Sequence, residues 1–336
     1  MLKKLFSHTF IYGIANQVPK IAGIFSLPLI TQYLTEEDYG IFGVITSYMA
    51  AIEVFSSLGL RVVLVNTFYK HSNWYVKIWR EIYGFLMLWN IGFMFFKVLF
   101  LWLLMPKEVD QIFLVIFLNV GAGLFFGPTA SIGSTYFQIN QKPVSIAMRT
   151  AVFGTLTILL NVFFIAYLKM GYIGWFYSIF IVTVLGNLSY FYPLFVTYKI
   201  TPIFKISWRR IKSYLRITLP TIPHYYSTFL LNTSDKIVME RLSVPINDIG
   251  KYNAAYTVGN FFNSIGMVSG FAITPLMNEC YKRKDEKAAR ELVFVLQGVF
   301  WGAVSLVTPC VFPMIPVTVS IFLEPLSRHS NRYIAV

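Results

Sequence analysis

The stretch Ile82–Met105, which reads IYGFLMLWNIGFMFFKVLFLWLLM, decides the fold class of this chain. Its residues are apolar or aromatic almost throughout, and Lys97 is the only charged side chain among them. A helix of about 20 apolar residues spans the hydrocarbon core of a bilayer, which is roughly 30 Å thick. The stretch therefore predicts a membrane-spanning helix.

Apolar runs of similar length recur along most of the chain. The others are Phe10–Leu34, Phe42–Leu64, Ile112–Phe137, Ala151–Leu168, Tyr172–Val196, Ile217–Leu231, Ala254–Met277 and Leu292–Val311. Of the 336 residues 56% are hydrophobic and only 13% are charged, whereas a soluble domain is nearer a quarter charged. The first run is too long for a secretory signal, so we expect it to be retained. We therefore expect an all-α polytopic membrane protein with about nine or ten transmembrane helices.

Positive charge is concentrated in alternate loops. About two thirds of the 28 Lys and Arg residues lie before the first run and after the second, fourth, sixth and eighth runs. The intervening loops are acidic or nearly uncharged, as at Glu36, Glu37 and Asp38. Because basic residues favour cytoplasmic loops, we expect the N-terminus in the cytoplasm. The net charge of +13 then reflects topology, and we expect no nucleic-acid partner.

Two loops of the chain resemble each other. Residues 35–43 read TEEDYGIFG and residues 245–256 read PINDIGKYNAAY, so that Asp38 aligns with Asp248 and Gly40 with Gly250. An Asp at a helix start can cap N–H groups, and a Gly lets two helices approach closely. Chance similarity of two short loops is the alternative. Because both loops follow odd-numbered runs, they predict two parallel repeats on the same side, as in transporters built from two lobes around a central site.

Several polar side chains fall inside predicted spans, where a charge is costly and usually faces a cavity or a partner. Lys20 lies beside Asn16 and Gln17 in the first run, and Asp235 and Lys236 lie in the seventh. If these two runs line the interface between lobes, the five residues are candidates for substrate binding. Lys20 and Lys236 would then offer positive charge to an anionic substrate. The alternative for Asp235 and Lys236 is that they lie near the outer end of the span and reach towards water.

Glu53, in the middle of the second run, is the candidate for ion coupling. The alternative is that Glu53 pairs with Lys20 and fastens two helices together. We interpret Lys97 as a feature of packing or helix tilt, and His224 as a hydrogen-bonded polar residue rather than a ligand.

The sequence contains no signature of a soluble enzyme. It has neither a phosphate-binding loop, nor a dinucleotide-binding glycine pattern, nor Cys/His metal spacing. Two cysteines, Cys280 and Cys310, make no disulfide framework. We therefore expect no catalytic residues, no cofactor and no metal. Without a phosphate-binding loop, secondary or passive transport is favoured over an ATP-driven pump.

Four segments resemble bacterial polysaccharide flippases, the Wzx-like members of the multidrug/oligosaccharidyl-lipid/polysaccharide exporter superfamily. They are FIYG at 10–13, PLITQYLTEEDYG at 28–40, SDKI at 234–237 and DIGKYNAAY at 248–256. The likeness covers about residues 1–295. It implies a two-lobed transporter bundle of about six helices per lobe, with the N-terminus inside.

The same resemblance implies the activity and the partners. Such a protein moves undecaprenyl-pyrophosphate-linked oligosaccharide units of O-antigen, capsule or exopolysaccharide across the bacterial inner membrane by alternating access. A basic lumen would hold the pyrophosphate or acidic sugars, and Lys20 and Lys236 match this expectation in residue type. The implied partners are the lipid-linked oligosaccharide, membrane lipids, a polysaccharide polymerase and glycosyltransferases.

The end of the chain departs from this family. Residues 302–320 read GAVSLVTPCVFPMIPVTVS and resemble the first membrane segment of thiol–disulfide interchange electron carriers, in which a Cys between prolines exchanges electrons. Cys310 lacks the second Cys that a dithiol relay needs. We therefore divide the chain into an N-terminal lobe (1–197), a cytoplasmic linker (198–216), a truncated C-terminal lobe (217–297) and a foreign or frameshifted tail (298–336).

Three alternatives to a lipid-linked oligosaccharide flippase stay open. The first is a cation-coupled multidrug exporter of the same superfamily, which should need an intramembrane acid such as Glu53. The second is a membrane thiol–disulfide electron carrier that uses Cys310. The third is an inactive, truncated remnant of a flippase.

Overall fold

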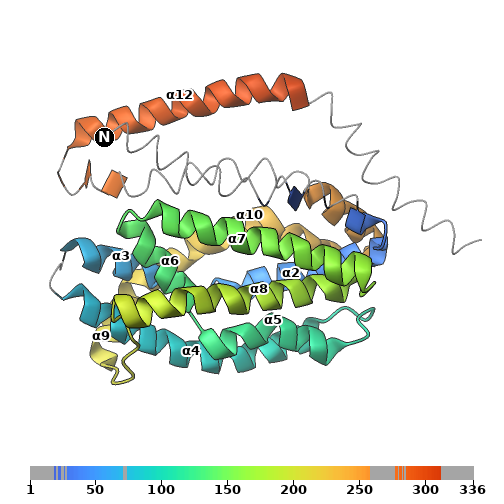
Figure 1. Ribbon diagram of the computed structural model, residues 1–336, viewed down its shortest axis with the longest axis horizontal. Helices are drawn as coiled ribbons and strands as arrows, with labels where there is room; N and C mark the ends of the chain where they lie inside the picture. The colour runs from blue at the N-terminus through green and yellow to red at the C-terminus, as the bar shows by residue number, and fades with distance from the viewer. Residues whose placement is uncertain are drawn as a thin grey trace, which may run out of the picture.

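The computed structural model of the chain describes residues 19, 22, 23, 26, 29–70, 74–257, 277, 278, 280, 281, 283 and 285–311. All regular secondary structure in these ranges is helical, which confirms the predicted all-α fold. The long helices run side by side along the longest axis of the molecule (Figure 1). Each helix satisfies its backbone hydrogen bonds internally, as a lipid environment requires.

The labelled helices differ widely in length. They are α2 (Glu36–Glu53), α3 (Arg61–Lys70), α4 (Tyr75–Leu104), α5 (Ile112–Phe126), α6 (Thr129–Ile139), α7 (Pro143–Asn161), α8 (Tyr172–Tyr192), α9 (Trp208–Thr218), α10 (Ile222–Arg241) and α12 (Glu286–Val311). Short π-helical turns at Val162–Tyr167 and Pro193–Thr197 extend α7 and α8. Residues 246–257 form a further helical segment.

Among the described residues, three helices are long and apolar enough to cross a membrane. They are Tyr75–Leu104, Pro143–Tyr167 and Tyr172–Thr197. The apolar run Ile82–Met105 falls almost wholly in α4, so the prediction of a continuous helix is confirmed there. The number of spans in the whole chain stays a prediction.

Residues with positive φ interrupt two other apolar runs. The run Phe42–Leu64 is interrupted between α2 and α3, where Leu58 and Gly59 have φ values of 49° and 67°. The run Ile112–Phe137 is interrupted between α5 and α6 at Gly127, whose φ is 48°. A right-handed helix cannot pass through positive φ, so these stretches bend where their apolar composition predicts continuity.

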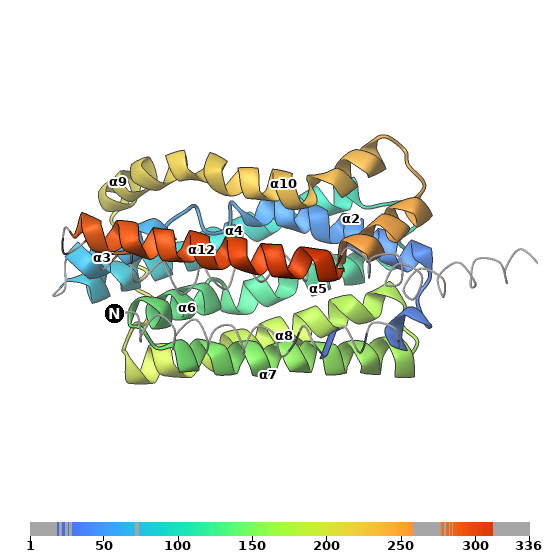
Figure 2. The same ribbon diagram turned by 90° about the horizontal axis from the view of Figure 1, so that it is seen from above.

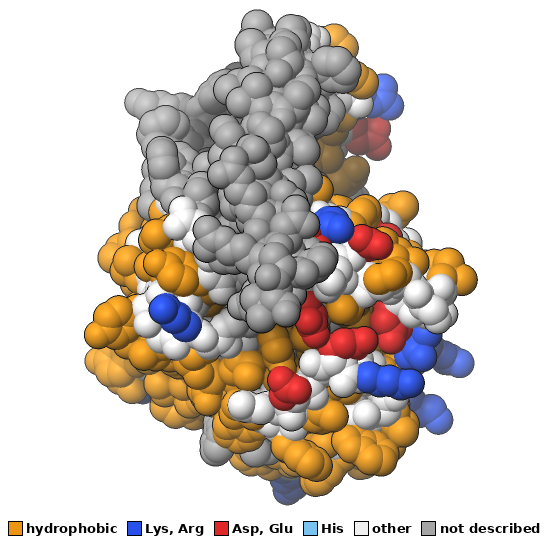
Figure 3. Space-filling view, turned by 90° about the vertical axis from the view of Figure 1, so that its right-hand side faces the viewer, with side chains coloured by type: hydrophobic (Ala, Val, Ile, Leu, Met, Phe, Trp, Pro, Cys, Tyr) orange, Lys and Arg blue, Asp and Glu red, His pale blue; other side chains and the backbone are white. Residues whose placement is uncertain are grey.

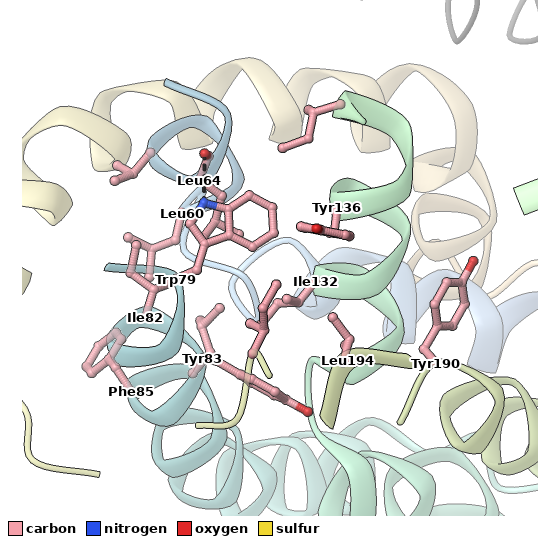
Figure 4. Close-up of a cluster of buried hydrophobic side chains, with 14 of the residues drawn as sticks. Leu60, Leu64, Trp79, Ile82, Tyr83, Phe85, Ile132, Tyr136, Tyr190 and Leu194 are labelled. Carbon is pink, nitrogen blue, oxygen red and sulfur yellow. Dashed lines mark hydrogen bonds between the residues drawn. The ribbon is translucent and has the colours of Figure 1, made fainter. Parts of the chain in front are cut away.

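A cluster of buried side chains joins α3, α4, α6 and the end of α8 (Figure 4). Trp79 and Tyr83, both on α4, are fully buried there. The indole N–H of Trp79 donates to the carbonyl oxygen of Leu64 at 3.0 Å, and the Tyr83 hydroxyl shares a 2.6 Å hydrogen bond with that of Thr129. Both rings therefore pack between helices without leaving a buried polar atom unpaired.

The predicted linker, 198–216, contains most of the short helix α9, which ends two residues later at Thr218. A 3-10 turn at Leu219–Thr221 joins α9 to α10, and Figure 2 shows the two helices in succession along one edge of the bundle. At the other end of the chain, α12 runs without a break across the predicted boundary between residues 297 and 298. The division of the chain into two lobes, a linker and a tail stays a prediction.

Candidate functional site

The two similar loops meet at one end of the bundle. A Cβ atom added to Gly40 would clash with the carbonyl oxygen of Ile246, and one added to Gly250 would clash with that of Glu36. Each glycine therefore abuts the residue that stands four positions before the other glycine. The contact is reciprocal, and both loops lie at the same end of the bundle, while the two parallel repeats stay a prediction. The expected role of the two glycines, close approach of helices, is confirmed.

Asp38 caps two helices at this contact. It forms a capping box with Thr35, whose backbone N–H and hydroxyl both donate to the Asp38 carboxylate at 2.8 Å. Its other carboxylate oxygen accepts from the backbone N–H of Tyr172 at 2.9 Å, at the start of α8. These bonds satisfy N–H groups at the beginnings of both helices.

An ion pair crosses between the two loops. The Lys251 ammonium lies 3.2 Å from Asp248 in its own loop and 3.4 Å from Glu36 in the other. The hydrogen bond that Lys251 donates to Asp248, followed by the charge of Glu36, raises the pKa of Lys251. Figure 3 shows this end of the molecule, where acidic side chains gather with a few basic ones among them. The loops are therefore joined by backbone contact and by charge.

Away from the loops, α2 and α10 continue in contact. The Tyr48 hydroxyl donates to the Glu240 carboxylate at 2.7 Å. The guanidinium of Arg241 lies 5.7 Å from the centroid of the Tyr48 ring and 3.4 Å from Glu240. Further along, the rings of Phe55 and Tyr226 are 6.2 Å apart. These contacts hold the N-terminal helix α2 against the polar helix α10.

Asp235 and Lys236 on α10 face the helical segment 246–257. The Tyr252 hydroxyl donates to the Asp235 carboxylate, which also accepts from the Lys236 backbone N–H at 2.9 Å. The Lys236 ammonium lies 4.4 Å from the centroid of the Tyr256 ring, and Lys236 is only 4% exposed. Tyr252 and Tyr256 stack on each other, with centroids 6.1 Å apart. Lys236 is thus buried by protein and does not reach towards water.

Lys236 makes no ion pair with any described carboxylate. The Tyr256 ring stabilises its charge in part, because the face of an aromatic ring attracts a cation. A buried cation without a paired anion is costly. Such a group is an attractive position for an anionic ligand.

Glu53 forms an ion pair with Lys97 of α4, and the two side-chain atoms are 2.6 Å apart. The Glu53 side chain is 57% exposed and that of Lys97 is 12% exposed. Ser56 also donates to the Glu53 carboxylate at 2.6 Å. Trp89 and Asn90 on α4 donate to backbone carbonyls just after α2, at 3.0 and 3.3 Å. Lys97 is therefore the counter-ion of Glu53, a pairing that the sequence did not predict. Trp89 and Asn90 stabilise the irregular backbone that follows α2.

Only some of the other predicted residues lie in the described part of the chain. Lys20, Asn16 and Gln17 lie outside the described residues. His224 is exposed on α10, with its ring 5.8 Å from that of Tyr225. Cys280 is buried, and Cys310 lies at the end of α12.

The described residues contain no group of His, Cys, Asp and Glu that could hold a metal ion. An open pocket of about 260 Å³ lies beside α12, and its lining includes none of the described candidate residues. It is lined by Met277, Tyr281, Ala289, Arg290, Val293, Phe294 and Gln297.

Sequence reasoning missed the aromatic partners of the α10 pair. Tyr252 and Tyr256 are four residues apart in the second repeated loop, so they share one helix face. That spacing was visible in the sequence. The partnership of Tyr48 with Glu240 had no such local signal, because 192 residues separate them.

The family described as "Polysaccharide biosynthesis protein" matches residues 5–280 of the chain. No curated protein sequence matches it significantly.

Solved transporter structures share its fold. A mutant of the Vibrio cholerae MATE transporter VcmN is 15% identical, with a TM-score of 0.67, over 97% of this chain and 80% of that one. An outward-facing multidrug resistance MATE family transporter of the MOP superfamily is 17% identical, with a TM-score of 0.65, over 95% and 78%. A MOP superfamily transporter from Pyrococcus furiosus, in which reverse polarity of the binding pocket suggests a different function, is 14% identical, with a TM-score of 0.62, over 96% and 76%. At these identities the likeness shows the fold alone, which is a two-lobed bundle of helices.

Proposed function

Because the chain belongs to the polysaccharide biosynthesis protein family and is a multi-pass membrane protein with the fold of MOP superfamily transporters, we propose that it is a flippase for lipid-linked oligosaccharides. Its substrate would be an undecaprenyl-pyrophosphate-linked repeat unit, moved across the bacterial inner membrane for O-antigen, capsule or exopolysaccharide. The N-terminus would lie in the cytoplasm, following the basic loops.

The observation that carries this proposal is the buried ammonium of Lys236. It has an aromatic neighbour in Tyr256 and makes no ion pair with a described carboxylate, although the charge of Asp235 acts on it. Lys97, by contrast, is neutralised by Glu53. A pyrophosphate carries negative charge on the lipid carrier, so a buried cation on α10 that makes no ion pair offers it a binding partner. Lys20, the second predicted cation, would contribute from the first run.

The reciprocal loop contact supplies the element that would open and close. In alternating access, two lobes rock about a fixed site. The contacts of Gly40 and Gly250, together with the pair of Lys251 and Glu36, join the loops at the acidic end. The Lys251 side chain is 49% exposed and that of Glu36 only 8%, so water screens this pair only in part. The pair would set the register of the closed loops, and it would have to break for them to part.

Complementation tests the proposal. A strain that lacks the flippase of the matching glycan cluster would express this chain, and surface glycan would be quantified. We expect the wild-type chain to restore export, Lys236→Gln to abolish it and Lys236→Arg to retain part of it. Lys142→Gln, which removes an exposed cation, serves as the control and should export normally. Failure of the wild-type chain at normal expression would overturn the proposal.

A second candidate function rests on Glu53. Its carboxylate is paired with Lys97 and remains more than half exposed, so a proton or a cation could compete for it. This arrangement favours a cation-coupled multidrug exporter as the alternative. In that case everted vesicles would take up a cationic dye under a proton or sodium gradient, and Glu53→Gln would stop the uptake. Dye uptake by wild-type vesicles that does not respond to the gradient would exclude this alternative.

A further inference from the structure

Helix α9 has one face packed on the bundle. Ile211 and Thr218 are buried, while Tyr214 and Leu215 are half-buried. These positions recur at intervals of three and four residues, so they form a single stripe along the helix. Ile211 is part of the buried cluster that contains Trp79. The inner face of α9 is therefore fixed by the core.

The opposite face of α9 is basic. Arg209, Lys212 and Arg216 are exposed and also follow one another at intervals of three and four. At 100° per residue this stripe lies opposite the buried one. None of the three forms an ion pair with a described carboxylate. The face thus presents three cations with no protein partner that the described chain supplies.

The linker before α9 is fastened to α4. The buried carboxylate of Glu81 accepts from the Ser207 backbone N–H at 2.9 Å and lies 3.1 Å from the Arg210 guanidinium. The Ile203 backbone N–H donates to the Arg80 carbonyl at 2.9 Å. These bonds use Arg210 to hold α9 in place. They leave the cations of the opposite face available.

Two exposed aromatic side chains, Trp208 and Phe204, lie at the start of α9 and just before it. Trp208 is 70% exposed, and its ring lies 6.1 Å from that of Phe85 on α4. One turn further along α4, Leu88 is 47% exposed, at the start of the outward apolar surface of that helix. Phe204 is 56% exposed just before α9. Both views of the molecule show α9 at the margin of the bundle (Figures 1 and 2).

We propose that α9 is a docking surface for anionic phospholipid headgroups. Arg209, Lys212 and Arg216 bind the headgroup phosphates, while Trp208 and Phe204 enter the interfacial region. Exposed aromatic residues favour this depth, and long basic side chains extend from it to the phosphates. A basic stripe with no protein counter-charge is complementary to an anionic leaflet. Because α9 leads through Leu219–Thr221 into α10, this contact holds the start of α10 at the membrane surface. The inference does not depend on the transported substrate.

Spin-labelled lipids test the proposal on the purified full chain. The protein is reconstituted in phosphatidylcholine vesicles, and electron spin resonance measures the association constants of labelled phosphatidylglycerol and labelled phosphatidylcholine at its surface. We expect wild type to prefer phosphatidylglycerol. The triple variant Arg209→Gln/Lys212→Gln/Arg216→Gln should lower that preference by about fivefold or more, since each cation near an anionic surface contributes about 1 kcal/mol. The charge-matched control Lys70→Gln/Lys77→Gln/Lys199→Gln removes three exposed cations elsewhere and should keep the preference.

Each other outcome counts against the proposal or for it. An unchanged preference in the triple variant, or an equal loss in the control, would overturn it. Inorganic phosphate that displaces the labelled lipid at constant ionic strength would instead identify a phosphate site and also overturn it. If the triple variant does not fold, Lys212→Gln is compared with Lys77→Gln, and only the first should lower the preference. Arg209→Lys/Arg216→Lys retains the charge and should behave as wild type.

Discussion

Gly250 lies directly against Gly40: a Cβ atom added to Gly250 would be 3.0 Å from the Gly40 backbone nitrogen. It would also clash with the carbonyl oxygen of Glu36. Both neighbours are backbone atoms, which cannot move aside as a flexible side chain does. The approach of the two loops therefore requires glycine at both positions.

We predict that Gly250→Ala lowers stability. The added methyl group forces the two loops apart, and overpacking of this kind typically costs about 1–3 kcal/mol. The melting temperature of the purified protein in detergent measures the effect. Gly186→Ala is the matched control, because no atom lies within 4 Å of a Cβ atom there. An alanine inside a helix should be neutral or stabilising. Equal melting temperatures for Gly250→Ala and wild type would contradict the described contact.

We predict that Lys236→Met separates stability from function. The Lys236 ammonium is buried without a paired carboxylate among the described residues, and replacing a buried charge by an apolar group of similar volume is often neutral or stabilising. The melting temperature should therefore be equal to or above that of wild type, while glycan export is lost. A variant that exports normally would show that the ammonium takes no part in transport.

We predict that a double-mutant cycle of Glu53 and Lys97 shows a coupling energy in stability. Lys97→Met leaves an unpaired carboxylate, and Glu53→Gln leaves an unpaired ammonium that is largely buried. The double variant removes both charges, so it should lose less stability than the sum of the single losses. Interaction energies between contacting residues are about 0.5–3 kcal/mol. Melting temperatures of the four proteins measure the difference, and additive losses would show that the pair contributes nothing.

The acidic end should respond to pH through Glu37. Burial, followed by the charges of Asp38, Glu108 and Asp110, raises the pKa of Glu37 from its ordinary value of 4.5. The folded protein therefore binds this proton more tightly than the unfolded chain, and the contribution of Glu37 to stability falls as the pH rises through its folded pKa.

Relative to Glu37→Gln, wild type should accordingly gain melting temperature as the pH is lowered from neutral towards 4.5. Glu286→Gln, on α12 and far along the chain, is measured in parallel as a variant that removes a carboxylate outside the two loops. A relative loss for wild type over this interval would indicate that the Glu37 carboxylate is stabilised instead.

The sequence predicted those features that depend on composition or on local spacing. The apolar run of α4 forms one helix, because transfer of apolar side chains into lipid depends on their composition alone. The aligned glycines identified the loop contact, because a missing side chain at equivalent positions of a repeat indicates close approach. Hydropathy carries no information about positive φ, so the interruptions at Gly59 and Gly127 were not foreseen.

Long-range partners were the other limit. Glu53 and Lys97 are 44 residues apart, and Tyr48 and Glu240 are 192 apart. Which charges meet depends on how α2, α4 and α10 pack, and no local pattern encodes that. The sequence therefore predicted that Asp235, Lys236 and Glu53 lie inside spans. It did not identify their neighbours, which are Tyr252, Tyr256 and Lys97.

The reciprocal contact of the two loops also has the symmetry of an interface between identical units. When position a of one unit touches position b of another, and b touches a in return, the interface is isologous, which is the geometry of a two-fold symmetric homodimer. Here Gly40 with Ile246 and Gly250 with Glu36 make that geometry inside a single polypeptide. The contact between the two loops thus has a local pseudo-two-fold symmetry within one chain.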